Sequence, residues 1–174
     1  MMLNDRMLKG LNEQITKELY SSYLYLQMAA WLDDHSFPGM AGWMKTQAQE
    51  EISHAMIFYN YVDERGGFVE LGAIDKPQAA FESVKAIFES TLEHEQKVTA
   101  SINALMDLAV ELKDYATRNR LEWFIEEQVE EESNAQGILD KVNLIGSGHG
   151  LFMLDKELGA RTFAVPSPLA GGEE

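Results

Sequence analysis

The stretch "WFIEEQVEEES" (123–133) carries five glutamates within the eight positions from Glu126 to Ser133. Glutamate favours helix, but like charges three and four positions apart on a helix repel one another by about 0.2–0.5 kcal/mol per pair. Acids that only solvate a surface say nothing about function. Acids that point into a core need a positive charge beside them, and a metal ion is the small group that supplies one.

The composition is that of a folded domain that is rich in acids and free of cysteine. The 174 residues suffice for one domain with a buried core, and 45% of them are apolar. The absence of cysteine excludes disulfides, thiolate metal sites and iron–sulfur clusters. The net charge of −15 argues against a nucleic-acid partner and favours the binding of cations. There is no signal-like leader and no run of roughly 18 apolar residues, so we expect a cytoplasmic protein with no membrane partner.

Helix-start and helix-stop signals predict five helices along the chain. The side chain of an asparagine or aspartate just before a helix accepts hydrogen bonds from the free backbone N–H groups of the first turn. Proline is favoured at the first helical position, and glycine is common just after the last one. By these signals the long helices run from Asn4 to about Asp34, from Pro38 to about Gly66, from just after residue 77 to about Ala109, and from Asp114 to about residue 145. A short fifth helix is expected over about 150–160 and a flexible tail over about 165–174. Residues 1–174 are expected to form a single domain whose bundle spans about 4–145.

The connecting segments predict how these helices are arranged. The links between the first and second helices and between the third and fourth are short, so each pair should be antiparallel. The connector around 68–77 is long enough to extend over about 40 Å, roughly the length of one of these helices. We therefore expect an all-α four-helix bundle in which one long crossover makes the second and third helices parallel. Phe68, Val69 and Leu71 are expected to pack this crossover against the bundle.

Each long helix has an inward-facing seam, at spacings of three and four residues, that is apolar at both ends and polar in the middle. In the second helix the seam reads Met40, Met44, Gln47, Glu51, His54, Phe58 and Tyr61. Mid-helix positions of a bundle meet at the same depth whether neighbours are parallel or antiparallel. One buried layer is therefore expected to contain Glu18, Glu51, His54, Glu95, Gln128 and Glu131.

This polar layer indicates a metal site. A single Glu-x-x-His pair such as Glu51 and His54 arises often by chance, and a single seam glutamate can reach solvent along its stem. Four buried glutamates without counter-charge, however, would cost several kcal/mol each or remain protonated. Two divalent cations neutralise four carboxylates, and carboxylates with one imidazole and no sulfur suit iron, manganese or zinc. If the bundle had a purely structural role, all six polar residues would have to occupy these buried positions by chance.

The chain resembles the bacterial non-haem ferritins over essentially its whole length. The motifs that carry the resemblance are "NEQITKELYSSYLYLQMA" (12–29), "QAQEEISHAM" (47–56), "TLEHEQKVT" (91–99), "FIEEQVEEES" (124–133) and "LFMLDKELGAR" (151–161). The resemblance implies a ferritin-like bundle that oxidises Fe(II) to Fe(III), with oxygen or hydrogen peroxide, at a di-iron ferroxidase centre inside each chain. It also implies iron storage in a hollow homo-oligomeric shell of 24 chains, in which the fifth helices meet around a four-fold axis.

The resemblance also assigns ligands to individual residues. Ferritin-like di-iron proteins use single glutamates from two helices and Glu-x-x-His from the other two. The fourth helix departs from this rule, because it carries Gln128-x-x-Glu131, and the weak ligand Gln128 leaves one metal less firmly held. By resemblance the first iron is bound by Glu18, Glu51 and His54, the second by Glu51, Glu95 and Glu131 with Gln128 beside it, and a third by Glu50, Glu127 and Glu130, sharing Glu131. Tyr25 is expected to hydrogen-bond a site carboxylate and to donate an electron, the open alternative being a plain core tyrosine.

Other members of the fold set the alternatives. Haem-binding relatives place a methionine after the bridging glutamate, where this chain has Ile52, so we expect no haem. Rubrerythrin-like proteins need cysteine, and DNA-binding mini-ferritins build their iron site between subunits. The main alternative is a stand-alone di-iron carboxylate oxidase without mineral storage, against which the third-site glutamates and the fifth helix argue.

Overall fold

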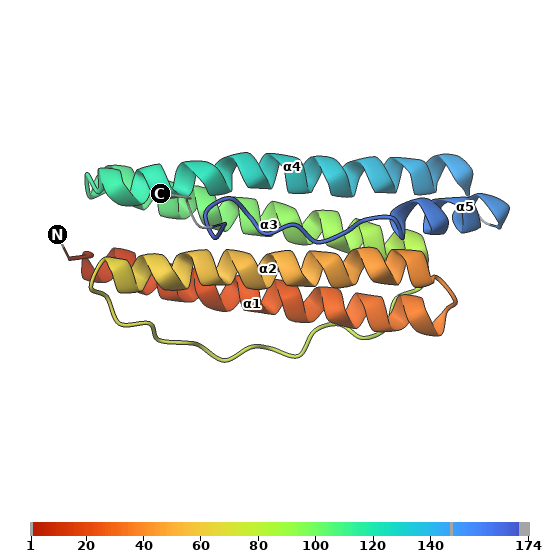
Figure 1. Ribbon diagram of the computed structural model, residues 1–174, viewed down its shortest axis with the longest axis horizontal. Helices are drawn as coiled ribbons and strands as arrows, with labels where there is room; N and C mark the ends of the chain where they lie inside the picture. Colours follow the sequence, from red (N-terminus) through yellow and green to blue (C-terminus); the bar gives the residue numbers. More distant parts are fainter. Residues whose placement is uncertain (1, 147, 171–174) are drawn as a thin grey trace.

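The computed structural model describes residues 2–146 and 148–170, and all regular secondary structure within these ranges is helical (Figure 1). The helices are α1 (Asp5–Asp34), α2 (Pro38–Glu64), α3 (Val84–Glu111), α4 (Tyr115–Ile145) and α5 (His149–Leu158). The predicted all-α class is confirmed. Within the described ranges, each helix is either too short or too polar to cross a membrane.

Side-chain caps define where the helices begin, mostly as predicted. The side chain of Asn4 accepts a hydrogen bond from the backbone N–H of Arg6 at 2.9 Å, and Asp114 accepts one from Thr117 at 3.1 Å. Gly66, with a φ of +69°, follows the end of α2 in the left-handed conformation that glycine adopts at little cost. These caps confirm the predicted starts of α1 and α4 and the end of α2.

The predicted start of the third helix was wrong. We expected it directly after residue 77, but α3 begins at Val84 and the preceding segment has no regular structure. The hydroxyl of Ser83 accepts a hydrogen bond from the backbone N–H of Ala86 at 3.1 Å, and this serine cap places the first turn of α3. The crossover therefore occupies residues 65–83.

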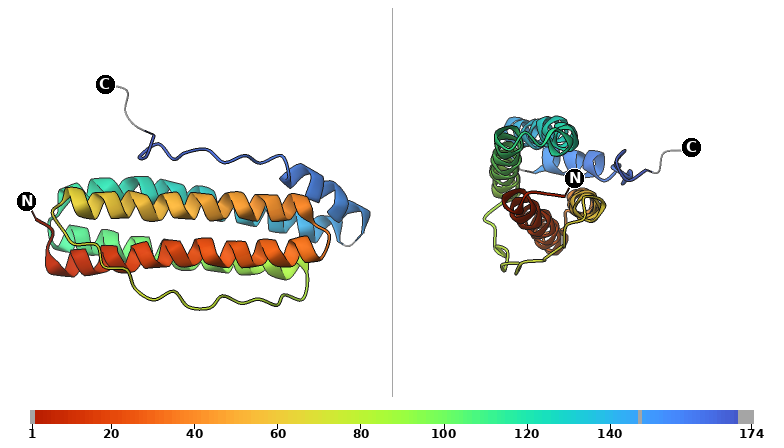
Figure 2. Two further views of the ribbon diagram at one scale, coloured as in Figure 1. Left: turned by 60° about the horizontal axis from the view of Figure 1, so that its bottom comes forward. Right: turned by 90° about the vertical axis from the view of Figure 1, so that its left-hand side faces the viewer.

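The helices form two antiparallel pairs, α1 with α2 and α3 with α4, and α1 also packs on α3. The crossover runs the whole length of the bundle beside α1, so α2 and α3 point the same way (Figures 1 and 2). The end-on view of Figure 2 places the crossover and the segment after α5 on different sides of the bundle. The predicted topology, with one long crossover between the second and third helices, is confirmed.

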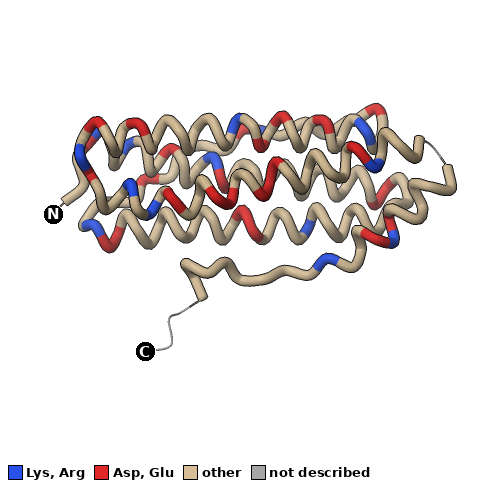
Figure 3. The backbone as a smooth tube through the Cα atoms, turned by 90° about the horizontal axis from the view of Figure 1, so that it is seen from above, with Lys and Arg blue, Asp and Glu red and all other residues tan. Residues whose placement is uncertain are grey.

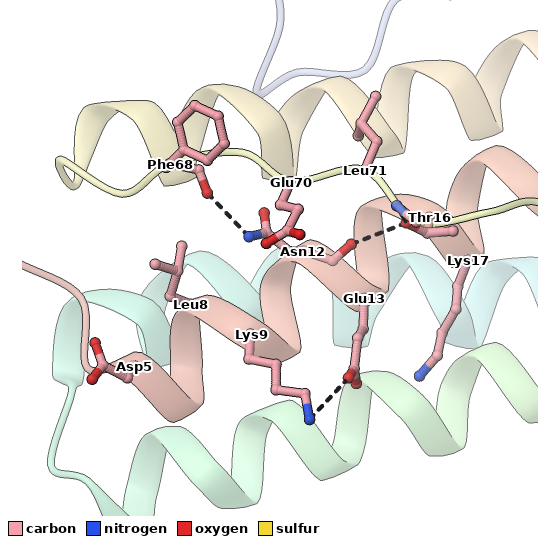
Figure 4. Close-up of a pocket in the computed structure, with 11 residues that line it drawn as sticks. Asp5, Leu8, Lys9, Asn12, Glu13, Thr16, Lys17, Phe68, Glu70 and Leu71 are labelled. Atoms are coloured by element: carbon pink, nitrogen blue, oxygen red, sulfur yellow. Dashed lines mark hydrogen bonds and ion pairs between the residues drawn. The ribbon is translucent and has the colours of Figure 1, made fainter.

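Polar side chains of α1 hold the crossover in place, as Figure 4 shows. The amide nitrogen Nδ2 of Asn12 donates to the carbonyl oxygen of Phe68 at 3.0 Å, and the backbone N–H of Gly72 donates to Oγ1 of Thr16 at 3.0 Å. The apolar packing predicted for this segment is only partly right. Val69 packs against the core, but Phe68 is 79% exposed and Leu71 57% exposed.

The core consists of two apolar clusters separated by a polar layer. One cluster lies at the end near α5 and the other at the end near the N-terminus. Every residue of the predicted α2 seam, from Met40 to Tyr61, is buried. The apolar residues of each cluster come from all four long helices: the first includes Met28, Met44, Phe88 and Ile138, and the second includes Met7, Phe58, Ile102 and Phe124.

Helix α5 packs against the end of its own bundle. Leu154 and Leu158 are buried, and the carboxylate of Asp155 accepts a hydrogen bond at 2.8 Å from the backbone N–H of Met40 in the first turn of α2. A Cβ atom on Gly39 would lie 1.9 Å from the carbonyl oxygen of Asp155, so this close approach requires glycine. The bundle therefore gives α5 more support than its short sequence predicts.

The segment after α5 returns along the bundle. Residues 160–170 are described and include a turn in which the N–H of Leu169 donates to the carbonyl of Pro166 at 2.9 Å. Leu169 also packs on the cluster near the N-terminus. The predicted flexible tail covers 165–174, of which residues 171–174 lie outside the described residues, and its flexibility stays a prediction.

Candidate metal centre

The six polar seam residues meet halfway along the bundle, between the two apolar clusters. Acidic positions occur along all four long helices, including their middle turns (Figure 3). All six side chains are at most 5% exposed, which places them in the core as the seams predicted. These residues are Glu18 of α1, Glu51 and His54 of α2, Glu95 of α3, and Gln128 and Glu131 of α4.

Glu18, Glu51 and His54 form a group in which one possible ligand atom from each residue lies within 4.8 Å of the others. Oε2 of Glu51 is 3.5 Å from Nδ1 of His54. In the described part of the chain, two buried atoms of this group, Oε2 of Glu18 and Nε2 of His54, have no hydrogen-bond partner. Buried polar atoms are nearly always satisfied, so each of these two atoms fits a cation as its missing partner.

A second group joins His54 to Glu127 and Glu131 of α4, again within 4.8 Å. Nε2 of His54 is 3.8 Å from Oε1 of Glu127. By resemblance we expected Glu51, Glu95 and Glu131 to bind the second metal, and this set is not one of the two groups found among the described residues. The three residues are nevertheless buried in the same layer, so their assignment stays a prediction.

Glu95 faces Tyr25 and Gln128. The phenol of Tyr25 donates a hydrogen bond to Oε1 of Glu95, and Nε2 of Gln128 lies 3.3 Å from Oε2 of the same carboxylate. Tyr25 is completely buried, and burial, followed by the nearby carboxylate of Glu95, raises the pKa of its phenol well above the usual value. The expected hydrogen bond from Tyr25 to a site carboxylate is therefore present, whereas its role as an electron donor stays a prediction.

Two buried glutamines that sequence analysis did not assign hold the carboxylates in place. Nε2 of Gln14 donates to Oε1 of Glu18 at 2.8 Å. Nε2 of Gln47 donates to Oε2 of Glu131 at 2.7 Å and to Oε1 of Glu51 at 3.3 Å. The same spacing could have revealed both, because each glutamine lies four residues, one helical turn, before a buried glutamate.

Burial controls the protonation of these carboxylates. Burial, followed by the nearby carboxylate of Glu51, raises the pKa of Glu18 to about 8. Burial also raises the pKa values of Glu51, Glu95 and Glu131, with neighbouring carboxylates adding to the effect for Glu51 and Glu131. Without a cation the layer therefore keeps protons that a metal ion would have to displace.

The glutamates expected to bind a third iron lie at the edge of this layer. Glu50 and Glu127 are partly buried, and burial is the main cause of the raised pKa of each carboxylate. Glu130 is exposed on α4. Glu50 forms an ion pair with Arg161, a contact that the sequence analysis did not predict. The structure thus brings Glu127 towards His54, leaves Glu130 at the surface, and gives Glu50 a cationic partner from the same chain.

Comparison with known proteins agrees with this geometry. The family model described as a ferritin-like domain matches residues 8–145. A probable bacterial non-haem ferritin-like protein of Haemophilus influenzae is 43% identical, over 91% of this chain and 96% of that protein. The bacterial non-haem ferritin of Escherichia coli O6:H1 is 42% identical, over 90% of this chain and 96% of that protein. Among solved structures, the open-pore ferritin of Archaeoglobus fulgidus matches with a TM-score of 0.91 and 45% identity, covering 92% of this chain and 98% of that one. The resemblance to bacterial non-haem ferritins is thus confirmed, and the chain belongs to the ferritin family.

Proposed function

We propose that this protein stores iron: it oxidises Fe(II) to Fe(III) at the mid-bundle centre and deposits the ferric product inside a shell of identical chains. The observation that carries the proposal is the buried group of Glu18, Glu51 and His54, in which one carboxylate oxygen and one ring nitrogen have no partner among the described atoms. Carboxylates with imidazole and no thiolate match the ligand preference of iron. The names of the similar proteins support the same function.

In this proposal Fe(II) is the substrate, and the residues of the polar layer would hold two ions, with Glu51 contributing to both positions. Each Fe(II) loses one electron, so a pair of Fe(II) ions reduces one O2, which takes up two protons to form hydrogen peroxide, or one hydrogen peroxide, which takes up two protons to form two waters. The chain's own residues prepare this step. Gln14 and Gln47 hold the carboxylates of Glu18 and Glu131 in position, and the buried glutamates release protons as the charged ions enter.

Aerobic titration with Fe(II) separates the proposed function from its alternatives. A storage protein takes up many irons per chain and keeps them in a large particle. A stand-alone di-iron oxidase takes up about two, and a purely structural bundle takes up none. Sedimentation with measurement of bound iron decides among the three, and a small particle that retains only two irons per chain would favour the oxidase.

The outer glutamates provide a first test of the metal assignment. We expect Glu127→Ala combined with Glu130→Ala to leave two tightly bound metals per chain and to remove a third, weaker one. Anaerobic titration followed by calorimetry measures this, with the exposed Glu126→Ala of the same helix as the control. Retention of three metals would contradict the third site. Loss of a tight metal would instead place Glu127 in the inner pair, as its 3.8 Å approach to His54 permits.

Assembly through α5 provides a second test. Phe152 and Met153 are 63% and 56% exposed, while Leu154, Asp155 and Leu158 attach the helix to its own bundle. Exposed apolar side chains of this size are suited to contact with copies of the same helix. We expect Phe152→Ser with Met153→Ser to keep each bundle folded and its metals bound but to destabilise the closed particle. Sedimentation and iron retention measure this. Full-size particles of unchanged heat stability would show that these residues do not contribute to assembly.

A further inference from the structure

The chain places a cation of its own beside the candidate metal centre. Arg161 lies three residues beyond the end of α5, where the chain turns back along the bundle. One nitrogen of its guanidinium, Nη2, forms an ion pair with Oε2 of Glu50. The second terminal nitrogen, Nη1, donates to Oε1 of Gln47 at 2.7 Å. The guanidinium carbon lies 4.5 Å from the ring centre of Trp43, so the cation also rests on an aromatic face.

This position is sheltered and leads directly to the inner ligands. The side chains of Arg161 and Glu50 are only 21% and 16% exposed, so solvent and salt screen their attraction weakly. Arginine can only donate hydrogen bonds, and Gln47 therefore presents its carbonyl oxygen to Arg161 and its amino group to the carboxylates of Glu51 and Glu131. The guanidinium contacts one outer carboxylate directly and two inner carboxylates through one amide.

We propose that Arg161 is a built-in counter-cation that competes with a metal ion for Glu50 and thereby makes the outer position of the centre the last to fill. This inference rests on the proposed function, because it concerns the metal position assigned to Glu50, Glu127 and Glu130. The structure assigns Arg161 a role in the order of metal binding and not in the electron transfer itself.

The chemistry of the groups supports competition. A guanidinium stays positively charged at every physiological pH, so it can leave Glu50 only by moving away. A divalent cation bound to Glu50 while Arg161 remained in contact would place two cations, with three positive charges in total, on one partly buried carboxylate. The inner ligands Glu18 and His54 have no cation of the chain beside them in the contacts described above, and two of their atoms lack partners. Metal therefore meets less competition at the inner positions.

The guanidinium of Arg161 is held by side-chain contacts, and the segment that carries it lies outside the four long helices. Residues 159–170 follow α5 without forming a helix or a β-strand, and most of their side chains are exposed. The N–H of Arg161 donates to the carbonyl of Leu158 at 3.2 Å, so its backbone is attached to the end of α5. Filling of the outer position is expected to release the guanidinium from Glu50 while α5 remains docked through Leu154, Asp155 and Leu158.

Calorimetric titration of the full chain with Zn²⁺ tests the proposal without any oxidation. We expect Arg161→Gln to strengthen the last and weakest Zn²⁺ binding step by about tenfold or more, the usual worth of one charge-assisted hydrogen bond. The first two steps should change by less than about threefold. Lys156→Gln, which removes the same charge from an exposed position on α5, is the matched control and should change none of them. Arg161→Lys keeps the charge but not the planar fork, and it should give an intermediate affinity.

Hydrogen exchange adds a readout that does not depend on affinity. In the unsubstituted protein, amides of residues 160–165 should exchange faster once the last Zn²⁺ binds, and in Glu50→Gln they should exchange fast without Zn²⁺. An unchanged or weaker last step in Arg161→Gln overturns the role of Arg161, even if two Zn²⁺ ions still bind. Failure of the unsubstituted protein to bind the first two ions would instead contradict the proposed function itself.

Discussion

Replacing Glu51 and His54 by alanine together is expected to slow the initial oxidation of Fe(II) by more than about 100-fold. Loss of groups that merely support metal ligands typically costs 10–100-fold in affinity or activity, and here two proposed ligands are removed at once. Glu51 lies in the group with Glu18 and His54, and His54 belongs to both groups of possible ligands. Stopped-flow absorbance of the ferric product measures the rate.

The same variant should fold as well without metal as the unsubstituted protein, or better. Alanine leaves space in the core, which is destabilising, but it also removes a buried carboxylate whose pKa is raised well above normal by burial and by Glu95. Glu126→Ala, a loss of one exposed carboxylate on α4, is the control for charge and should oxidise iron normally. Normal initial oxidation in the double variant would contradict the proposed site. Loss of folding would show that the polar layer is structural.

The fold could be predicted from the sequence because helix periodicity and bundle geometry together determine which residues meet. A seam such as Met40 to Tyr61 specifies one buried face, and its polar centre can meet only the polar centres of the other helices. The glutamates at these centres and His54 were found in this way. The start of α3 was missed because no cap was assigned before the third helix, whereas the structure caps it with the hydroxyl of Ser83.

The environment of the site was less predictable. Gln14 lies on the flank of its seam, four residues before Glu18, and that spacing allows the hydrogen bond between them without showing which rotamers the two side chains adopt. Arg161 is more than a hundred residues from Gln47 and Glu50 in sequence, and it reaches them only because α5 docks on α2 and turns the chain back. No local pattern around Arg161 carries that information. A tertiary contact of this kind is visible only in the structure.

The polar layer has an energetic consequence for the whole bundle. Two apolar clusters could stabilise the fold without interruption, yet the chain places four carboxylates between them. In the metal-free protein these groups are stable mainly in their protonated form, because burial raises their pKa values. Metal ions reverse this preference, since they favour the ionised carboxylates. Stability should therefore depend on pH in opposite ways with and without metal.

Glu18→Gln isolates one of these groups. In the folded metal-free protein the pKa of Glu18 is about 8, against an ordinary value of 4.5, so the folded chain holds a proton that the unfolded chain releases between these values. The stabilisation is complete below pH 4.5 and is lost as pH rises through 8. By pH 9 the loss amounts to at most roughly 5 kcal/mol. The amide of the variant stays neutral, and its oxygen can still accept a hydrogen bond from Gln14. We therefore expect the melting temperature of the variant to fall less with rising pH than that of the unsubstituted protein.

Thermal unfolding after chelation, measured between about pH 5 and pH 9, tests this expectation. The variant should melt close to the unsubstituted protein at the acid end and clearly higher at the alkaline end, while Glu51 and Glu131 leave a residual pH dependence in both. With Zn²⁺ in excess the order should reverse, because an amide oxygen is a weaker ligand than a carboxylate. Glu126→Gln makes the same change of charge at an exposed position and should follow the unsubstituted protein throughout. Identical pH profiles for Glu18→Gln and Glu126→Gln would show that Glu18 does not hold the proton in the metal-free protein, and that another group of the buried layer does.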